Sequence, residues 1–150
     1  MTTYIGIDPG LDGGLAAITD DNLYVTRMPT LTDHGKRQID TATIRSILID
    51  LGPSIVTIED VNAGAVPGRG SAFAFGRGLG RVEQLVADLE RPCDYVRPQR
   101  WLRDLGIGVG ATKAEHIATA RRLFPAVTID TDGQADALLI AEWCRRTWRK

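Results

Sequence analysis

The segment Tyr4-Ile5-Gly6-Ile7-Asp8-Pro9-Gly10 joins a short apolar run to a carboxylate and a turn. The apolar residues predict a buried strand over residues 3–7, and Pro9-Gly10 marks the turn that follows it. A carboxylate directly after a buried strand is costly unless it is paired, hydrated or bound to a metal. A single Asp in this place is most simply a cap or a surface ion pair, so the positions of other acids decide its meaning.

Two more carboxylates lie at the ends of predicted apolar elements. Glu59 follows the run Ile55-Val56-Thr57-Ile58, and Asp136 lies at the start of the apolar stretch 135–143. Hard oxygen ligands suit Mg²⁺ or Mn²⁺, and two such ions about 4 Å apart can support hydrolysis of a phosphodiester. Together with Asp8, these acids favour a divalent-metal site over three unrelated surface residues.

Length and composition favour one soluble domain. The chain has 150 residues, of which 43% are apolar, enough for one core and a single domain over residues 1–150. No stretch approaches the roughly 20 apolar residues that span a bilayer, and no basic leader precedes the first strand, so we expect a cytoplasmic protein with no membrane partner. Cys93 and Cys144 are isolated, so structural zinc is not expected, a disulfide has no support, and both are expected to pack in the fold.

Charge is distributed unevenly along the chain. Residues 1–60 contain 4 Lys/Arg and 9 Asp/Glu, a net −5, whereas residues 61–150 contain 14 and 10, a net +4. Of the 18 cationic residues, 15 are Arg, and guanidinium groups match phosphate better than ammonium groups do. The pattern favours a polyanionic partner, although an ordinary solvated surface explains the Arg excess about equally well.

The apolar patterns predict an α/β protein with a mixed sheet. The predicted strands cover residues 3–7, 14–19, 23–28, 55–58 and 95–96, and residues 29–38 are predicted to be a polar loop. The predicted helices cover residues 40–51, the later part of 71–89, 112–124 and 134–146. The first three strands read as an antiparallel meander, and the continuous apolar run at 55–58 is typical of a central strand covered on both faces.

This order of elements and acids resembles the ribonuclease H-like superfamily and, within it, the RuvC-type Holliday-junction resolvases, particularly the compact versions of bacteriophages. The resemblance spans nearly the whole chain. It rests on an ordered set of segments, namely residues 5–10, 58–59, 71–86, 96–98 with Trp101, Lys113 at a helix start, 123–125 at that helix's end, and 132–138. It implies a ribonuclease H-like mixed five-stranded sheet, with three antiparallel strands followed by parallel strands, flanked by helices.

The resemblance also implies a catalytic metal centre. Asp8, Glu59 and Asp136 match the metal ligands of the family, with two Mg²⁺ or Mn²⁺ ions in each active site. In such a site Asp8 and the helix carboxylates would hold one ion, which would activate a water. Asp8 and Glu59 would hold the other, which would stabilise the leaving 3′ oxygen. No covalent enzyme intermediate is required.

The chain departs from the family at one ligand position. A fourth acidic or His ligand usually lies three residues before the last Asp, and Gly133 stands there instead. Asp132 precedes Asp136 by four residues, a spacing that puts both side chains on one helix face, so Asp132 is either the replacement ligand or a plain N-cap. Asp130 is a less suitable replacement. Lys113 matches a position that faces the scissile phosphate, or is a solvated residue of a first helical turn.

The segment 61–81 is rich in Gly and Arg and is predicted to be flexible, so that its backbone amides and guanidinium groups can approach phosphates. In the family, an aromatic or similar side chain after the central-strand Glu stacks on unpaired bases. Phe73 or Phe75 would have to supply that wedge here, and core packing is expected for at least one of them. The predicted DNA-binding residues are Arg69, Phe73, Phe75, Arg77 and Arg81.

The remaining histidines and tryptophans receive no catalytic role from the sequence. His34 is predicted to lie in a mobile loop and His116 within a helix, and neither has a metal-ligand spacing. Trp101, Trp143 and Trp148 are expected to be packing or interface residues.

We therefore expect a crossover junction endodeoxyribonuclease, a metal-dependent hydrolase that cleaves Holliday junctions or other branched DNA in recombination or repair, in a bacterial or phage-infected cell. A four-way junction has approximate two-fold symmetry and needs paired nicks, so we expect a homodimer. The alternatives are an RNA-processing nuclease of the same fold and a non-catalytic DNA-binding module. Residues 6–10 with Gly13-Gly14 also resemble the phosphate loop of actin-like ATPases, but those proteins need two such domains.

Overall fold

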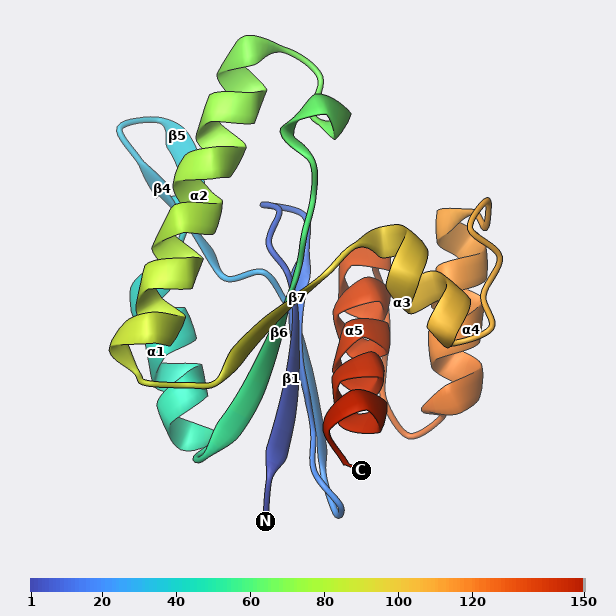
Figure 1. Cartoon of the computed structure of the whole chain (residues 1–150). Helices are drawn as coiled ribbons and strands as arrows, with labels where there is room; N and C mark the ends of the chain where they lie inside the picture. The colour runs from blue at the N-terminus through green and yellow to red at the C-terminus, as the bar shows by residue number, and fades with distance from the viewer. Residues whose placement is uncertain (150) are drawn as a thin grey trace.

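The computed structural model describes residues 1–149. Its centre is a five-stranded sheet with the order β3-β2-β1-β6-β7 (Figure 1). Its strands are β1 (Thr3–Asp8), β2 (Gly14–Ile18), β3 (Leu23–Arg27), β6 (Ser54–Glu59) and β7 (Cys93–Val96). β1, β2 and β3 pair antiparallel, whereas β6 pairs parallel with both β1 and β7. The predicted mixed sheet, with three antiparallel strands followed by parallel ones, is confirmed.

Helices cover both faces of this sheet (Figure 1). α1 (Thr41–Asp50) and α2 (Arg69–Asp88) pack on one face, and α5 (Asp132–Trp148) lies on the other, flanked by α3 (Pro98–Asp104) and α4 (Lys113–Leu123). A short 3₁₀ turn, η1 (Ala63–Ala65), precedes α2. Within residues 1–149, no helix combines the length and the apolar composition that crossing a membrane requires.

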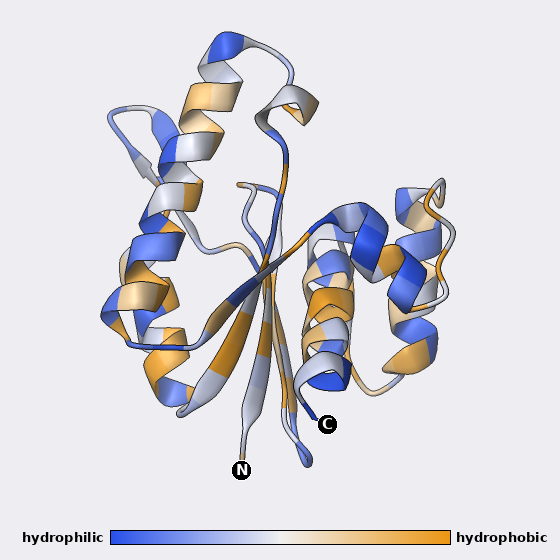
Figure 2. Cartoon of the chain, viewed as in Figure 1, coloured by the Kyte–Doolittle hydropathy of each residue, from blue (hydrophilic) through white to orange (hydrophobic). Residues whose placement is uncertain are grey.

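The strands bury side chains on both sides, which gives the molecule two apolar layers. In β2, Leu15 and Ala17 pack into the layer under α1 and α2, whereas the alternate residues Ala16 and Ile18 pack into the layer under α5. Figure 2 shows the apolar colour along the central strands and on α5. A sheet covered on both faces explains why β6 reads as a continuous apolar run in the sequence.

α5 lies in direct contact with the centre of the sheet. A Cβ atom at Gly6 of β1 would collide with the backbone of Ala137 and Ala141, and a Cβ atom at Gly14 would collide with the backbone of Gly133. Close-packed interiors do not absorb such overlaps, so any side chain at these two glycines would push the helix away. The glycines thereby fix the first turn of α5 beside the loop that follows β1.

The prediction of a polar loop over residues 29–38 is wrong. β4 (Thr30–Asp33) and β5 (Lys36–Ile39) form a separate antiparallel hairpin. His34 and Gly35 connect the two strands with positive φ angles of 47° and 72°, as in the type I′ turns that suit two-residue hairpins. His34 therefore lies in the two-residue turn of this hairpin and not in a long loop.

The prediction of a flexible segment over 61–81 is wrong from Arg69 onward, because α2 begins there and continues to Asp88. Each glycine weakens a helix by about 1 kcal/mol relative to Ala, which is why a Gly-rich sequence favours a loop. Val82, Leu85 and Val86 anchor the second half of the helix in the core. The first half projects beyond the sheet (Figure 1).

α3 is a helix that the sequence patterns did not predict. Pro98 occupies its first turn, where a proline is well tolerated because the missing N–H would have no helical partner. The helix has 7 residues, too few for a periodic apolar pattern to be recognised. Its main contribution to the core is Trp101, of which 1% is exposed.

Candidate active site

The first two predicted acids are the last residues of neighbouring parallel strands. Asp8 ends β1 and Glu59 ends β6. Ile7 lies opposite Ile58 in the parallel register, so the two carboxylates follow at the same edge of the sheet. In α/β proteins this carboxyl edge is where ligands bind.

The other two predicted acids lie on the first turns of α5. Thr131 caps this helix, because its hydroxyl accepts a hydrogen bond from the Gln134 amide at 3.2 Å, and the Gln134 side chain completes a capping box. The interpretation of Asp132 as an N-cap is therefore wrong. Asp132 is the first residue of the helix, four positions before Asp136 and on the same face.

The structure explains why a glycine stands at the position where the resemblance implied a fourth ligand. A Cβ atom at Gly133 would collide with the backbone of Asp12 and Gly13, in the loop between β1 and β2. No side chain fits at that position. Position 133 therefore cannot supply an acid on the first turn of α5, and the neighbouring residue, Asp132, supplies one instead.

Glu59 is the most strongly perturbed of these acids. It is 7% exposed, and burial raises its pKa to about 8, with a further increase from the charge of Asp8. The indole Nε1 of Trp101 donates a hydrogen bond to Glu59 Oε1 at 2.9 Å, which stabilises the ionised form and partly opposes the shift. The nearby charge of Asp136 raises the pKa again.

Asp8 and Asp136 are perturbed in the same direction. Burial raises the pKa of Asp8 to about 6, against the hydrogen bond from the Gly10 amide, and the charge of Asp132 adds to the increase. Burial raises the pKa of Asp136 to about 7, followed by the charges of Asp8 and Asp132. Glu59 is therefore near Asp8 and Asp136, and both of these aspartates are near Asp132. We call Asp8, Glu59, Asp132 and Asp136 the carboxylate cluster.

Lys113 lies beside this cluster, at the first position of α4. Its Nζ is 2.9 Å from Asp132 Oδ2, and this hydrogen bond and the Asp132 charge raise the pKa of the lysine. The side chain is 82% exposed, so it pairs with the cluster from the solvent side. A cation at a helix N-terminus opposes the helix dipole, and the ion pair with Asp132 compensates for that.

Two residues to which the sequence gave no catalytic role touch the cluster. Besides the contact of Trp101 with Glu59, the Nδ1 of His116 lies 2.7 Å from Asp136 Oδ1. The two rings meet edge to face, with centroids 5.6 Å apart. Nothing in the sequence spacing signals these pairings, because each joins a helix to an acid far along the chain.

The chemistry of the carboxylate cluster suits Mg²⁺ or Mn²⁺. All four groups offer carboxylate oxygens, the donors that these hard cations prefer. Burial and the charges of neighbouring acids disfavour the ionised forms of Asp8, Glu59 and Asp136, and a bound divalent cation would reverse that penalty. Within residues 1–149, no three His, Cys, Asp or Glu side chains already lie in positions to hold one ion.

A groove opens next to the cluster, between the β4–β5 hairpin, residues 9–12 and α2. It has a volume of about 610 Å³, and its wall begins at Pro9, the residue after Asp8. Arg37 ties the hairpin to this end, because its guanidinium donates to Asp12 Oδ1 and to the Leu11 carbonyl, both at 2.7 Å. We call it the hairpin groove. Its cationic lining residues are Lys36, Arg37, Arg77 and Arg81.

The five predicted DNA-binding residues lie on α2, outside the carboxylate cluster. Phe75, Arg77 and Arg81 line the hairpin groove, and Arg81 donates to Gln38 Oε1 of β5 at 2.8 Å. Phe73 is 69% exposed and lies under the Arg77 guanidinium at 5.8 Å. Arg69 is exposed at the first position of the helix. Of the two phenylalanines, Phe73 is the exposed one and Phe75 is half-buried.

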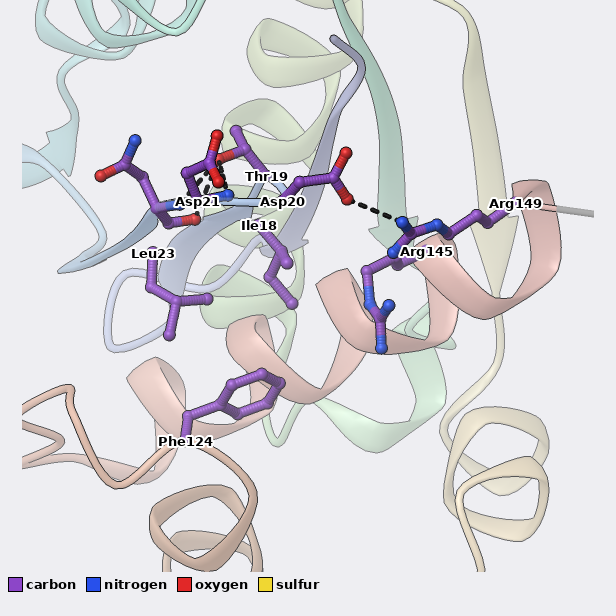
Figure 3. Close-up of a pocket in the computed structure, with 9 residues that line it drawn as sticks. Ile18, Thr19, Asp20, Asp21, Leu23, Phe124, Arg145 and Arg149 are labelled. Atoms are coloured by element: carbon purple, nitrogen blue, oxygen red, sulfur yellow. Dashed lines mark hydrogen bonds and ion pairs between the residues drawn. The ribbon is translucent and has the colours of Figure 1, made fainter.

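A second, smaller pocket lies at the opposite edge of the sheet. It has a volume of about 320 Å³ and is formed by the β2–β3 turn, Phe124 and the end of α5. Figure 3 shows Asp20 pointing to Arg149, an ion pair of 2.9 Å. β2 runs antiparallel to β1, with Ile18 opposite Tyr4, so this pocket adjoins the start of β1 and not the carboxylate cluster.

Comparison with known proteins identifies similar structures but no similar sequence. No protein-family model and no curated protein sequence matches the chain. The RuvC of Thermus thermophilus in complex with a Holliday junction substrate matches with a TM-score of 0.68 and 20% identity, over 94% of this chain and 90% of that chain. A second structure of Thermus thermophilus RuvC gives a TM-score of 0.64 and 21% identity, over 93% and 90% of the two chains. The predicted ribonuclease H-like fold of the RuvC type is confirmed.

Proposed function

We propose that this chain is a metal-dependent endonuclease that cleaves four-way or otherwise branched DNA by hydrolysis of phosphodiester bonds. The observation that carries the proposal is the carboxylate cluster. Four acids from β1, β6 and α5 meet at the carboxyl edge of a RuvC-like fold, and burial and mutual repulsion raise the pKa of three of them. Acids that remain close together although their burial and repulsion lower the stability of the fold are typical of a functional site.

The carboxylate cluster would hold two Mg²⁺ or Mn²⁺ ions, which when bound supply an activated water and stabilise the charge on the leaving oxygen. The protein's own contribution is to arrange the ligands. Asp8 and Glu59 come from adjacent strands, and Asp132 and Asp136 from one helix face. Lys113 faces solvent beside Asp132, where a cation can bind an incoming phosphate and stabilise charge that develops on it.

The hairpin groove would receive one strand of the DNA. Its cationic residues match a phosphate backbone, and its wall begins next to Asp8, so a strand lying in it would pass the carboxylate cluster. The exposed face of α2 would extend this contact through Arg69 and Arg77. Phe73 is exposed and could stack on an unpaired base at the centre of the junction.

The active species would be a homodimer of this single domain, acting in the cytoplasm of a bacterial or phage-infected cell. One subunit provides one carboxylate cluster, whereas resolution of a junction needs two nicks related by its two-fold symmetry. Coupled nicking of a cruciform plasmid, together with sedimentation of the protein on the junction, tests the dimer. Single uncoupled nicks by a monomer would contradict it.

The proposed activity is tested with end-labelled four-way junction, flap, linear duplex and structured RNA, each with EDTA, Mg²⁺ or Mn²⁺. We expect cleavage of the junction only when metal is present, and little cleavage of the linear duplex. Asp136→Asn serves as the inactive control. Cleavage of RNA alone would indicate an RNA-processing nuclease, and junction binding without any cleavage would indicate a non-catalytic DNA-binding module.

A further inference from the structure

Trp101 makes a polar contact from inside the core to the carboxylate cluster. Its ring is 1% exposed, and its Nε1 donates to Glu59 Oε1 at 2.9 Å. Within residues 1–149, this is the one hydrogen bond that the Glu59 carboxylate receives. This hydrogen bond occupies one carboxylate oxygen of Glu59 and leaves the second oxygen available to bind a cation.

His116 makes the equivalent contact to Asp136. Its side chain is 12% exposed, and its Nδ1 lies 2.7 Å from Asp136 Oδ1. Within the described part of the chain, the Asp136 carboxylate has no other hydrogen-bond partner, so its second oxygen is also available. When the aspartate is ionised, Nδ1 must carry the proton and act as the donor.

The two rings also hold each other in place. Trp101 and His116 pack edge to face, with an interplanar angle of 70°. α3 supplies one ring and α4 the other, whereas the two carboxylates come from β6 and α5. A chain of four side chains, Glu59, Trp101, His116 and Asp136, therefore runs from the sheet through two helices to α5.

We propose that Trp101 and His116 are positioning residues, which orient the carboxylates of Glu59 and Asp136 so that one oxygen of each faces the divalent cation. This inference rests on the proposed metal-dependent function. Partners of this kind around metal ligands fix the ligand orientation, and their loss commonly lowers metal affinity 10- to 100-fold. The structure thus assigns α3 and α4 a part in the metal centre, although neither helix supplies a ligand.

The test is calorimetric titration of Mn²⁺ into wild type and variants. Trp101→Phe removes the indole N–H and keeps an aromatic ring, and we expect about 10-fold or weaker Mn²⁺ binding. Trp143→Phe is the matched control, because the Nε1 of this buried tryptophan donates to Asp104 Oδ2, also at 2.9 Å, outside the carboxylate cluster. Trp143→Phe should bind Mn²⁺ as wild type does.

His116 is tested with two substitutions, because it could also act as a direct metal ligand. The amide nitrogen of Asn can replace Nδ1 as a donor, so His116→Asn should keep affinity within a few-fold, whereas His116→Ala should lose about 10-fold. Equal losses in both variants would overturn the positioning role of His116. Thermal unfolding of each variant shows whether it is folded, and His116→Asn remains informative if Trp101→Phe is not.

Cleavage assays give a second readout. A positioning defect weakens metal binding, so excess Mn²⁺ should restore cleavage by Trp101→Phe without changing the KM for the junction, and it should not rescue a variant that lacks Glu59. Wild-type affinity in both Trp101→Phe and His116→Ala would overturn this inference and leave the nuclease proposal intact. Absence of Mn²⁺ binding by wild type would overturn both.

Discussion

Replacement of Glu59 by Gln should stabilise the metal-free protein at high pH and should greatly reduce the stabilisation that the protein gains from metal. In the folded state the pKa of Glu59 is about 8, against 4.5 for an ordinary Glu, so folding disfavours the charged form. The contribution of Glu59 to stability is therefore most favourable below pH 4.5 and declines as the pH rises through 8. The difference between these two pKa values corresponds to a loss on the order of 5 kcal/mol by pH 9.

Gln keeps a carbonyl that accepts the hydrogen bond from Trp101 and has no charge to bury. Unfolding by denaturant in EDTA at pH 5, 7 and 9 measures the effect, with the exposed Glu90→Gln as the control. Wild type and Glu59→Gln should have similar free energies of unfolding at pH 5, and Glu59→Gln should have the higher one at pH 9. Wild type will also decline because of Asp8 and Asp136, so the diagnostic quantity is the difference between the two proteins. A difference that does not change with pH would refute the reasoning.

Bound metal should raise the stability that ionisation of Glu59 lowers. Mg²⁺ that binds only the folded state should raise the stability of wild type at pH 8, by an amount that grows with the logarithm of its concentration. Glu59→Gln should respond far less, because one ligand and one negative charge are missing. A variant that is more stable yet inactive is the behaviour expected of a residue retained for function.

Asp8→Asn and Asp132→Asn should each abolish cleavage and leave junction binding within a few-fold, as measured with labelled junctions in Mg²⁺; full cleavage by either would remove that residue from the site. Arg69→Ala combined with Arg77→Ala should weaken junction binding. It should also reduce the slope of log K against log salt by about 0.9 for each phosphate that the protein no longer neutralises. An unchanged slope would contradict a role for these arginines in DNA binding. Glu142 is buried between two arginines. Burial raises its pKa, but the hydrogen bonds and charges of Arg145 and Arg146 together outweigh burial and lower the pKa overall. The contribution of Glu142 to stability is therefore complete above pH 4.5 and is lost in more acidic solution. Glu142→Gln should reduce the free energy of unfolding at pH 7 by about 1 to 2 kcal/mol. In denaturant titrations near pH 3, the difference from wild type should be smaller.

Some parts of the fold could not be predicted from local patterns. The β4–β5 hairpin has no apolar alternation, and it is held by contacts such as Arg37 with Asp12 that join distant segments. The first half of α2 is rich in glycine, whose low helix propensity favours a loop when neighbours are ignored. In both places the local residue preferences favoured a loop, whereas the structure forms a hairpin in one and a helix in the other.

The order of strands along the chain and the positions of Asp8 and Glu59 at strand ends followed from residue type and position alone, because a buried strand needs a continuous apolar run and an acid at its end stands out against it. The arrangement of the strands in the sheet and the role of Asp136 were implied by the resemblance. The status of Asp132 did not follow. It required the position of the Thr131 cap and the contact that excludes a side chain at Gly133. The roles of Trp101 and His116 depended still more on packing, since each ring reaches a carboxylate on another element. Such pairings are set by how helices dock on the sheet, and no spacing within one segment of the chain encodes that geometry.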